Sequence, residues 1–232
     1  MQNVIDNFTI HHFKEASSTN DLAFDLIKNN QAFDHHIIVA NKQTSGRGRY
    51  GRSWLSFDGN LYLSLIIKIS NIHRICDYSL LTACVLGSTL KHFRIYTKYK
   101  WPNDIIFEDK KLAGILLQSQ IINKTNYLII GIGVNLNDAP DYAISLKNFN
   151  IKKEDLIEKL AVFYDKYLEN YKNFGFLSIK NEWKDNAYKI YENIKLSNGK
   201  EGIFQDIDSD GNLILKNING KIEKILSEEV FI

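Results

Sequence analysis

Cysteine, proline and long apolar runs are all scarce in this sequence. The two cysteines, Cys76 and Cys84, match neither a disulfide framework nor a zinc motif, so we expect a reducing, cytoplasmic environment. The two prolines, Pro102 and Pro140, mark no proline-rich linker. No apolar run approaches the ~18 residues of a membrane span. The first residues also lack a basic segment followed by an apolar one, which argues against a signal peptide.

Neither sign of charge is in large excess. The 29 lysines and arginines against 27 aspartates and glutamates give a net charge of +2. This balance argues against a general binder of nucleic acid or of membranes. Only five of the cations are arginines, however, and Arg47, Arg49 and Arg52 fall within six residues. A chain that uses lysine elsewhere needs the planar guanidinium here, which suits phosphate or carboxylate.

The length and composition indicate a globular protein with a small appendage. The chain has 232 residues, of which 44% are hydrophobic and 24% charged. Asn-Gly and Asp-Gly pairs separate short strands near the C-terminus and predict a small β-barrel there. We therefore expect a catalytic-sized domain over residues 1–186 and a small β domain over residues 187–232.

Apolar periodicity predicts an α/β (α+β) fold, in which helices flank a mixed β-sheet. Asn20 is a possible cap of the first helix. The expected helices cover residues 20–29, 75–94 and 152–174. The expected strands of the main sheet cover residues 36–40, 61–69, 95–101, 104–107, 112–122 and 127–134.

A loop rich in glycine and arginine follows the first of these strands. Gly46, Gly48 and Gly51 satisfy the dinucleotide pattern G-x-G-x-x-G, but that pattern must open a helix, and this loop leads into a turn and a strand. No acidic residue stands between Gly59 and Ile75, where a dinucleotide fold needs one. A P-loop is excluded as well, because no Gly-Lys-Ser/Thr follows.

The composition of this loop favours binding of a small anion. Glycine allows close approach to a ligand, and arginine offers forked donors to anionic oxygens. A basic patch that contacts nucleic acid is the alternative, although such a patch usually spreads lysines and aromatics over a wider surface. We expect the loop to be mobile until its anion binds.

Two further motifs combine polar groups with apolar strands. Lys100–Asp104 (KWPND) is held extended before its proline, and Lys111 enters an apolar strand that contains Gly114. A lysine on a buried strand keeps its charge only where an anion meets it. A packed aromatic turn and an exposed lysine remain open alternatives. In Gly131–Asn137 (GIGVNLN), two glycines interrupt a buried strand, and Asn135 is either a turn residue or a ligand contact.

Taken together, these motifs resemble those of the biotin protein ligases, in that family's order and spacing. The matching segments are SSTN at Ser17–Asn20, QTSGRGRYGRSW at Gln43–Trp54, KWPND at Lys100–Asp104, KLAG at Lys111–Gly114 and GIGVNLN at Gly131–Asn137. The resemblance implies a class II synthetase-like catalytic core with a C-terminal SH3-like barrel. Because SSTN begins at residue 17, it also implies the ligase-only form, without a DNA-binding domain and without DNA as a partner.

The resemblance also implies a role for each matching residue. The implied catalytic residues are Lys111, Arg47, Arg49 and Asp104. Lys111 is expected to bridge the biotin carboxylate and the α-phosphate. Asp104 is further expected to bind magnesium or to receive the proton of the acceptor lysine. The residues expected to bind biotin are Ser18, Thr19, Gln43, Gly46, Arg47, Arg49, Lys111, Gly114 and Gly131. The residues expected to bind ATP or AMP are Arg49, Arg52, Trp54, Asn103, Lys111 and Asn135.

The implied activity is that of a biotin–[biotin carboxyl-carrier protein] ligase. Such an enzyme uses ATP and Mg²⁺ to convert biotin to biotinyl-5'-AMP and then modifies one lysine of the biotin carboxyl carrier protein of acetyl-CoA carboxylase. The cations fit this chemistry, because a carboxylate and a triphosphate repel each other unless arginine and lysine neutralise them. The alternatives are a lipoyl or octanoyl ligase, a nucleic-acid-binding module and a ligand sensor without catalysis. We expect no membrane partner, and both a monomer and a homodimer remain open.

Overall fold

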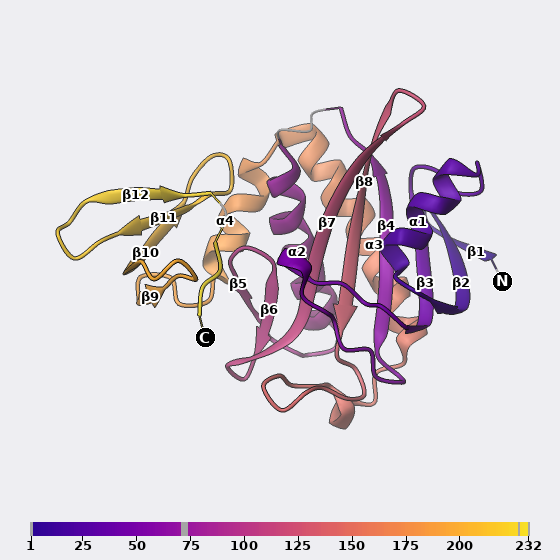
Figure 1. Cartoon of the computed structure of the whole chain (residues 1–232), viewed down its shortest axis with the longest axis horizontal. Coiled ribbons are helices and arrows are strands. Elements are labelled where there is room, and N and C mark those ends of the chain that lie inside the picture. Colours follow the sequence, from indigo (N-terminus) through magenta and orange to yellow (C-terminus); the bar gives the residue numbers. More distant parts are fainter. Residues whose placement is uncertain (1, 71–73, 227, 232) are drawn as a thin grey trace.

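A mixed sheet is the centre of the computed structural model, which describes residues 2–70, 74–226 and 228–231 (Figure 1). Its eight strands in the described residues are hydrogen-bonded in the order β1-β2-β3-β4-β8-β7-β6-β5. All neighbouring pairs are antiparallel except β2 and β3, which are parallel. The strands are β1 (Gln2–Ile5), β2 (Phe8–Ala16), β3 (His36–Gln43), β4 (Leu61–Lys68), β5 (Lys98–Lys100), β6 (Asp104–Phe107), β7 (Lys110–Ile122) and β8 (Thr125–Val134).

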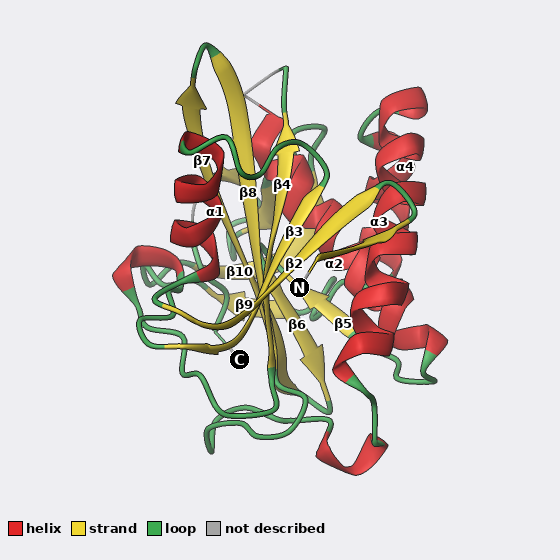
Figure 2. Cartoon of the chain, turned by 90° about the vertical axis from the view of Figure 1, so that its right-hand side faces the viewer, coloured by secondary structure: helices red, strands yellow, loops and turns green. Residues whose placement is uncertain are grey.

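Helices cover both faces of this sheet, which confirms the predicted fold class. The helices are α1 (Thr19–Lys28), α2 (Ile75–His92), α3 (Lys153–Phe174) and α4 (Leu177–Asp185). Figure 2 shows α1 on one side of the sheet and the other three on the opposite side, and α1 packs against β3, β4 and β8. Within the described ranges, no helix combines the length and apolar character that crossing a membrane requires.

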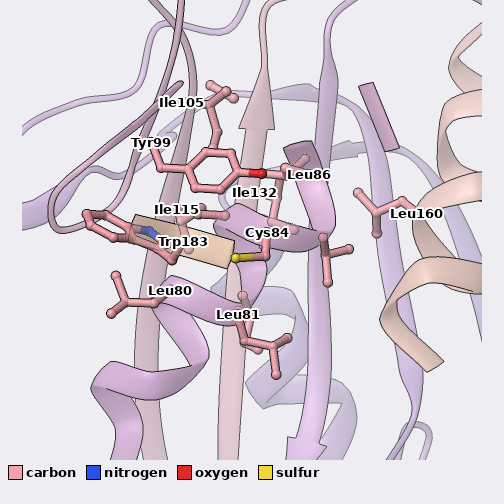
Figure 3. Packing of buried hydrophobic residues seen from close by; sticks show 14 of the residues in the cluster. Leu80, Leu81, Cys84, Leu86, Tyr99, Ile105, Ile115, Ile132, Leu160 and Trp183 are labelled. Atoms are coloured by element: carbon pink, nitrogen blue, oxygen red, sulfur yellow. The ribbon is translucent and has the colours of Figure 1, made fainter. Parts of the chain in front are cut away.

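Two hydrophobic cores result from this layering. The larger core fills the space between the sheet and α2, α3 and α4, where Leu80 and Cys84 of α2 pack among Ile115, Ile132 and Trp183 (Figure 3). The smaller core lies beneath α1. Because both of its faces are covered, the central strand β4 is buried at every position except its last. This explains why β4 reads as a continuous apolar run rather than an alternating one.

The expectation that Asn20 caps the first helix is wrong. Ser18 stands at the N-cap, and α1 begins at Thr19. Asn20 is buried instead, where its amide donates to Gln118 Oε1 at 2.7 Å and its Oδ1 accepts from Ser64 Oγ at 2.6 Å. An asparagine with buried partners for its side chain gains more from them than from a solvent-exposed cap.

Other differences concern weak local signals. The strand expected at 95–101 shortens to β5, because Arg94 adopts a left-handed φ of 63° and Ile95 packs into the core as part of a connection. The strands β1 and β2 and the helix α4 were not anticipated. Many of their residues face solvent, since β2 is partly exposed along most of its length and α4 buries only Ile179 and Trp183. Their sequences therefore lack a clear apolar pattern.

The C-terminal part of the chain forms a second sheet, which is antiparallel and four-stranded in the described residues. This agrees with the small SH3-like β domain predicted from the sequence. Its strands are β9 (Asn193–Lys195), β10 (Glu201–Ile207), β11 (Leu213–Lys216) and β12 (Ile222–Ile225). The turns predicted from glycine pairs carry left-handed φ at Gly199, Gly211 and Gly220. The contacts that dock this sheet on the larger part of the molecule include a hydrogen bond from Trp101 Nε1 to the Gly211 carbonyl at 3.0 Å and an ion pair of 2.9 Å between Arg74 and Asp210.

Trp183 is the side chain whose loss we expect to disturb both sheets. It is 1% exposed, and its ring lies 6.4 Å from the Tyr99 ring on one side and 6.4 Å from the Phe204 ring of β10 on the other. Trp183→Ala should lower the free energy of unfolding by about 3–5 kcal/mol in urea denaturation. Phe174→Ala is the control, because Phe174 is 71% exposed and should cost less than about 0.5 kcal/mol. Equal losses for the two variants would contradict the assigned packing.

Candidate active site

A cavity of about 260 Å³ lies over β7 and β8, beside the N-terminus of α1. Its walls are the loop after β3, the turn before β6, the loop after β8 and Glu229 of the C-terminal segment. It brings together these residues predicted from the sequence: Ser18, Thr19, Gln43, Arg47, Arg49, Arg52, Trp54, Asn103, Asp104, Lys111, Gly114, Gly131 and Asn135. Among the described residues, Gly46 is the predicted one that does not line it. A Cβ on Gly46 would lie 2.6 Å from the Trp54 carbonyl, so this glycine lets the loop fold back on itself.

Two glycines in the floor of the cavity leave room for an indole ring that lies on them. A Cβ would come within 2.9 Å of the Trp54 ring at Gly114 and within 2.6 Å of it at Gly133. Lys111 Nζ lies 5.4 Å from the centroid of the same ring, a distance at which a cation is attracted to the ring face. The two strands therefore position Trp54 and Lys111 against each other.

One end of the cavity is a buried polar network under α1. Gln43 Oε1 accepts from the Thr19 amide at 2.9 Å and from Thr19 Oγ1 at 3.2 Å. Ser64 Oγ lies 2.7 Å from Thr19 Oγ1 and 2.6 Å from Asn20 Oδ1, and its single proton can be donated to either of these oxygens. Asn20 and Ser64 were not predicted as site residues, although Asn20 belongs to the SSTN motif that signalled its neighbours. These hydrogen bonds hold the polar side chains at this end in place before any ligand binds.

Two lysine side chains, which lie beside Asp104, line the cavity away from this network. Lys111 Nζ lies 2.7 Å from Asp104 Oδ1, and Lys100 Nζ lies 3.6 Å from Asp104 Oδ2. Burial lowers the pKa of Lys100, and the neighbouring charge of Lys111 lowers it further, although Asp104 acts in the opposite direction. Asp104 thus lies between two ammonium groups and neutralises only one of them.

The arginines of the glycine-rich loop already have partners in the protein. Arg47 forms an ion pair of 2.8 Å with Asp21 of α1, and Arg49 Nη1 donates to Asn103 Oδ1 at 3.2 Å. The loop also closes on itself, since Gly48 N donates to the Arg52 carbonyl at 2.6 Å. The sequence predicted a loop that is mobile until its anion binds, but Arg47 already has an anionic partner and Arg49 a neutral polar one. A ligand anion must compete with groups of the protein.

Arg52 connects this loop to the C-terminal sheet. It forms an ion pair with Glu229, which lines the cavity although it is distant in sequence. Ser197, two residues after β9, holds Glu229 in place, because its amide donates to the Glu229 carbonyl at 2.9 Å and its Oγ accepts from the Glu229 amide at 3.0 Å. No motif in the sequence signals Glu229, since its contribution depends on the docking of the second sheet.

The expectation that Asp104 binds magnesium does not fit this arrangement. Both of its oxygens face lysine ammonium groups, and Asn103 Oδ1 accepts from Arg49. The part of the chain that the structure describes contains no group of three or more His, Cys, Asp or Glu residues suited to a metal ion. Mg²⁺ commonly enters nucleotide sites on the phosphates, so we treat it as part of the nucleotide substrate and assign it no resident site.

A pocket with a polar network at one end and an excess of cationic side chains is typical of a protein that binds an anionic ligand. The chain belongs to the biotin/lipoate A/B protein ligase family, which its sequence matches over residues 13–135. Residues 193–232 match the biotin protein ligase C terminal domain.

Relatives cover most of the chain. The bifunctional ligase/repressor BirA of Bacillus subtilis (strain 168) is 33% identical over an alignment that covers 92% of this chain and 71% of that protein. The biotin–[acetyl-CoA-carboxylase] ligase of Paracoccus denitrificans is 30% identical, over 84% of this chain and 89% of its own length. The structure of the biotin protein ligase from Aquifex aeolicus in complex with biotin and ATP matches with a TM-score of 0.81 and 26% identity, covering 96% and 97% of the two chains. These similarities confirm the resemblance inferred from the motifs.

The Arg47–Asp21 pair should contribute to the order of the loop without ligand. Asp21→Asn removes the carboxylate, and exposed pairs of this kind are worth about 0.2–1 kcal/mol. Amide hydrogen exchange across residues 46–52 should therefore accelerate by up to about fivefold, while exchange in α2 stays unchanged. Asp25→Asn, on the same helix, is the control, and equal exchange in Asp21→Asn and the wild type would contradict the role of this pair.

Proposed function

We propose that this protein activates biotin with ATP to give biotinyl-5'-AMP, and then transfers biotin to a lysine of the biotin carboxyl carrier protein of acetyl-CoA carboxylase, with release of AMP and pyrophosphate. The observation that carries the proposal is one cavity that joins a fixed polar network to a cluster of cations. Relatives named as biotin ligases over most of the chain support it.

The polar network under α1 suits the ring end of biotin, which is uncharged and carries hydrogen-bond donors and acceptors. Thr19 and Gln43 are already linked there, and Ser18 lies beside them on the cavity wall. Gly114 and Gly131 also line the cavity, where the absence of a Cβ lets the side chains of Trp54 and Asn20 pack closely against the strands. Lys111 lies at the far end of this floor, where the carboxylate of biotin is expected to bind.

Lys111 is the cation proposed to act in the chemical step. A carboxylate oxygen of biotin attacks the α-phosphorus of ATP, and negative charge increases on the phosphate oxygens. A lysine whose position is fixed by Asp104 and Trp54 stabilises this charge without having to reorganise. We assign Arg49, Arg52, Trp54, Asn103 and Asn135 to the nucleotide.

The glycine-rich loop is proposed to protect the intermediate. An acyl-adenylate hydrolyses readily, so the enzyme must exclude water until the acceptor lysine arrives. Arg47 and Arg49 lie on this loop and line the cavity, where they reach the bound adenylate if they leave Asp21 and Asn103. Asp104 is the carboxylate proposed to receive the proton that the acceptor amine loses.

The wider setting of the enzyme is also proposed. We assign the catalytic chemistry to residues 1–186 and a supporting role to residues 187–232, which supply Glu229 to the cavity. We place the enzyme in the cytoplasm, as a monomer or homodimer that acts without DNA or membrane. The near-balanced net charge of +2 supports the last point.

Intact-mass spectrometry tests the activity. Incubation with biotin, Mg·ATP and a biotin carboxyl carrier domain should add one biotin to that domain, and lipoate in place of biotin should add none. A carrier domain whose acceptor lysine is replaced by arginine is the control. An unmodified wild-type carrier at saturating substrate would refute the proposal, and modification by lipoate alone would assign the chain to the other branch of its family.

Lys111→Ala and Arg47→Ala should affect different steps. Lys111→Ala removes a preorganised cation where charge develops, so biotinyl-AMP formation should slow about 10²–10³-fold. Arg47→Ala should leave this rate within a few fold but allow the intermediate to escape and hydrolyse. Single-turnover assays that follow the formation and release of biotinyl-AMP separate the two effects. A wild-type rate of adenylation in Lys111→Ala would show that another group is the catalytic cation.

A further inference from the structure

Lys100 lines the same cavity but has no part in the steps described so far. It is the last residue of β5, and its side chain is only 11% exposed. Its Nζ lies 3.6 Å from Asp104 Oδ2, whereas Lys111 lies 2.7 Å from Asp104 Oδ1. Two ammonium groups therefore share one carboxylate, and one positive charge is left without a full counter-charge in surroundings that are mostly buried.

This charge needs an anion from outside the protein. Burial is the largest cause that lowers the pKa of Lys100, and the charges of Lys111 and Arg52 also lower it, against the opposite effect of Asp104. A desolvated cation is stable as a cation only when an anion pairs with it. Because Lys111 holds Asp104 at the shorter distance, a ligand is the natural source of the second anion.

The order of the strands shows which part of a ligand reaches Lys100. The polar network of Thr19 and Gln43 lies at α1 and β3, whereas β5 forms the opposite edge of the sheet. Lys111, on β7, lies between these two positions. If the biotin carboxylate and the α-phosphate meet at Lys111, a group further along the sheet meets Lys100 and Arg52. The adenosine of ATP is uncharged, whereas the two outer phosphates are anionic, so the phosphates fit this end.

We propose that Lys100 binds the pyrophosphate group that leaves during adenylation, an assignment that rests on the proposed function. In this step a carboxylate oxygen of biotin forms a bond to the α-phosphorus. The bond from the α-phosphorus to the oxygen that bridges it to the β-phosphate breaks, and its electron pair stays on pyrophosphate. Lys100 donates hydrogen bonds as an ammonium group to the oxygens that gain this charge, and no proton is transferred.

Lys100→Met separates this role from the other roles of the site, because it keeps the length of the side chain and removes the charge. Biotinyl-AMP formation, and its reversal by added pyrophosphate, should each slow about 10²–10³-fold. Transfer from supplied biotinyl-AMP to the carrier domain should stay within about twofold, since pyrophosphate has already left. Lys100→Arg should restore part of the first two rates. Lys98→Met, an exposed lysine of the same strand, is the matched control and should resemble the wild type in every assay.

Calorimetric titration of the protein with pyrophosphate alone tests the proposal without depending on enzyme activity. Binding should weaken at least tenfold in Lys100→Met and stay unchanged in Lys98→Met. If the wild type makes no biotinyl-AMP but still binds pyrophosphate through Lys100, the proposed function fails and this site stands. Unchanged pyrophosphate binding in Lys100→Met would overturn the proposal. An equal loss of rate in adenylation and in transfer would overturn it too, and would make Lys100 a residue that positions Asp104.

Discussion

Repulsion between cations in one pocket is the constraint that the surrounding structure satisfies. The cations that line the pocket are Arg47, Arg49, Arg52, Lys100 and Lys111. At short range and with partial burial, such charges repel strongly unless carboxylates lie between them. The carboxylates that pair with them come from α1, from β6 and from the C-terminal segment: Asp21, Asp104 and Glu229. The three elements, far apart in sequence, are thereby tied to one site.

The hydrophobic layers supply the rigidity that this arrangement needs. The strand β4 is buried at every position except its last, and Leu128, Ile130 and Val134 of β8 pack in the larger core, so the floor of the pocket cannot shift without opening a core. Gly114 of β7 and Gly133 of β8 leave only the room that the Trp54 ring fills, and Gly131 of β8 leaves room for Asn20. Since Lys111 contacts both Trp54 and Asp104, its ammonium group is fixed by packing as well as by charge. A long lysine side chain on a less rigid surface would sample many positions and lose this orientation.

The sequence predicted what depends on local patterns. The covered strands, the long amphipathic helix that became α3 and the glycine turns of the second sheet all carry strong local signals, and the five motifs located most of the pocket. Contacts between distant segments carry no such signal. Asn20 looked like a cap because its partner Ser64 lies 44 residues away, and Glu229 went unnoticed because it reaches Arg52 across 177 residues. Gly46 was assigned to the pocket wall, whereas it serves the folding of its own loop.

The pairing of every loop arginine within the protein bears on how the enzyme selects its substrates. A single carboxylate, such as that of free biotin, offers no more charge than the Asp21 or Glu229 that it would replace, so the exchange gains little. A triphosphate carries several charges on one molecule, and in the proposed assignment it pairs with Arg49, Arg52 and Lys100 together. Because Glu229 belongs to the C-terminal segment, the proposed binding of Arg52 to the nucleotide would also remove one contact between that segment and the glycine-rich loop.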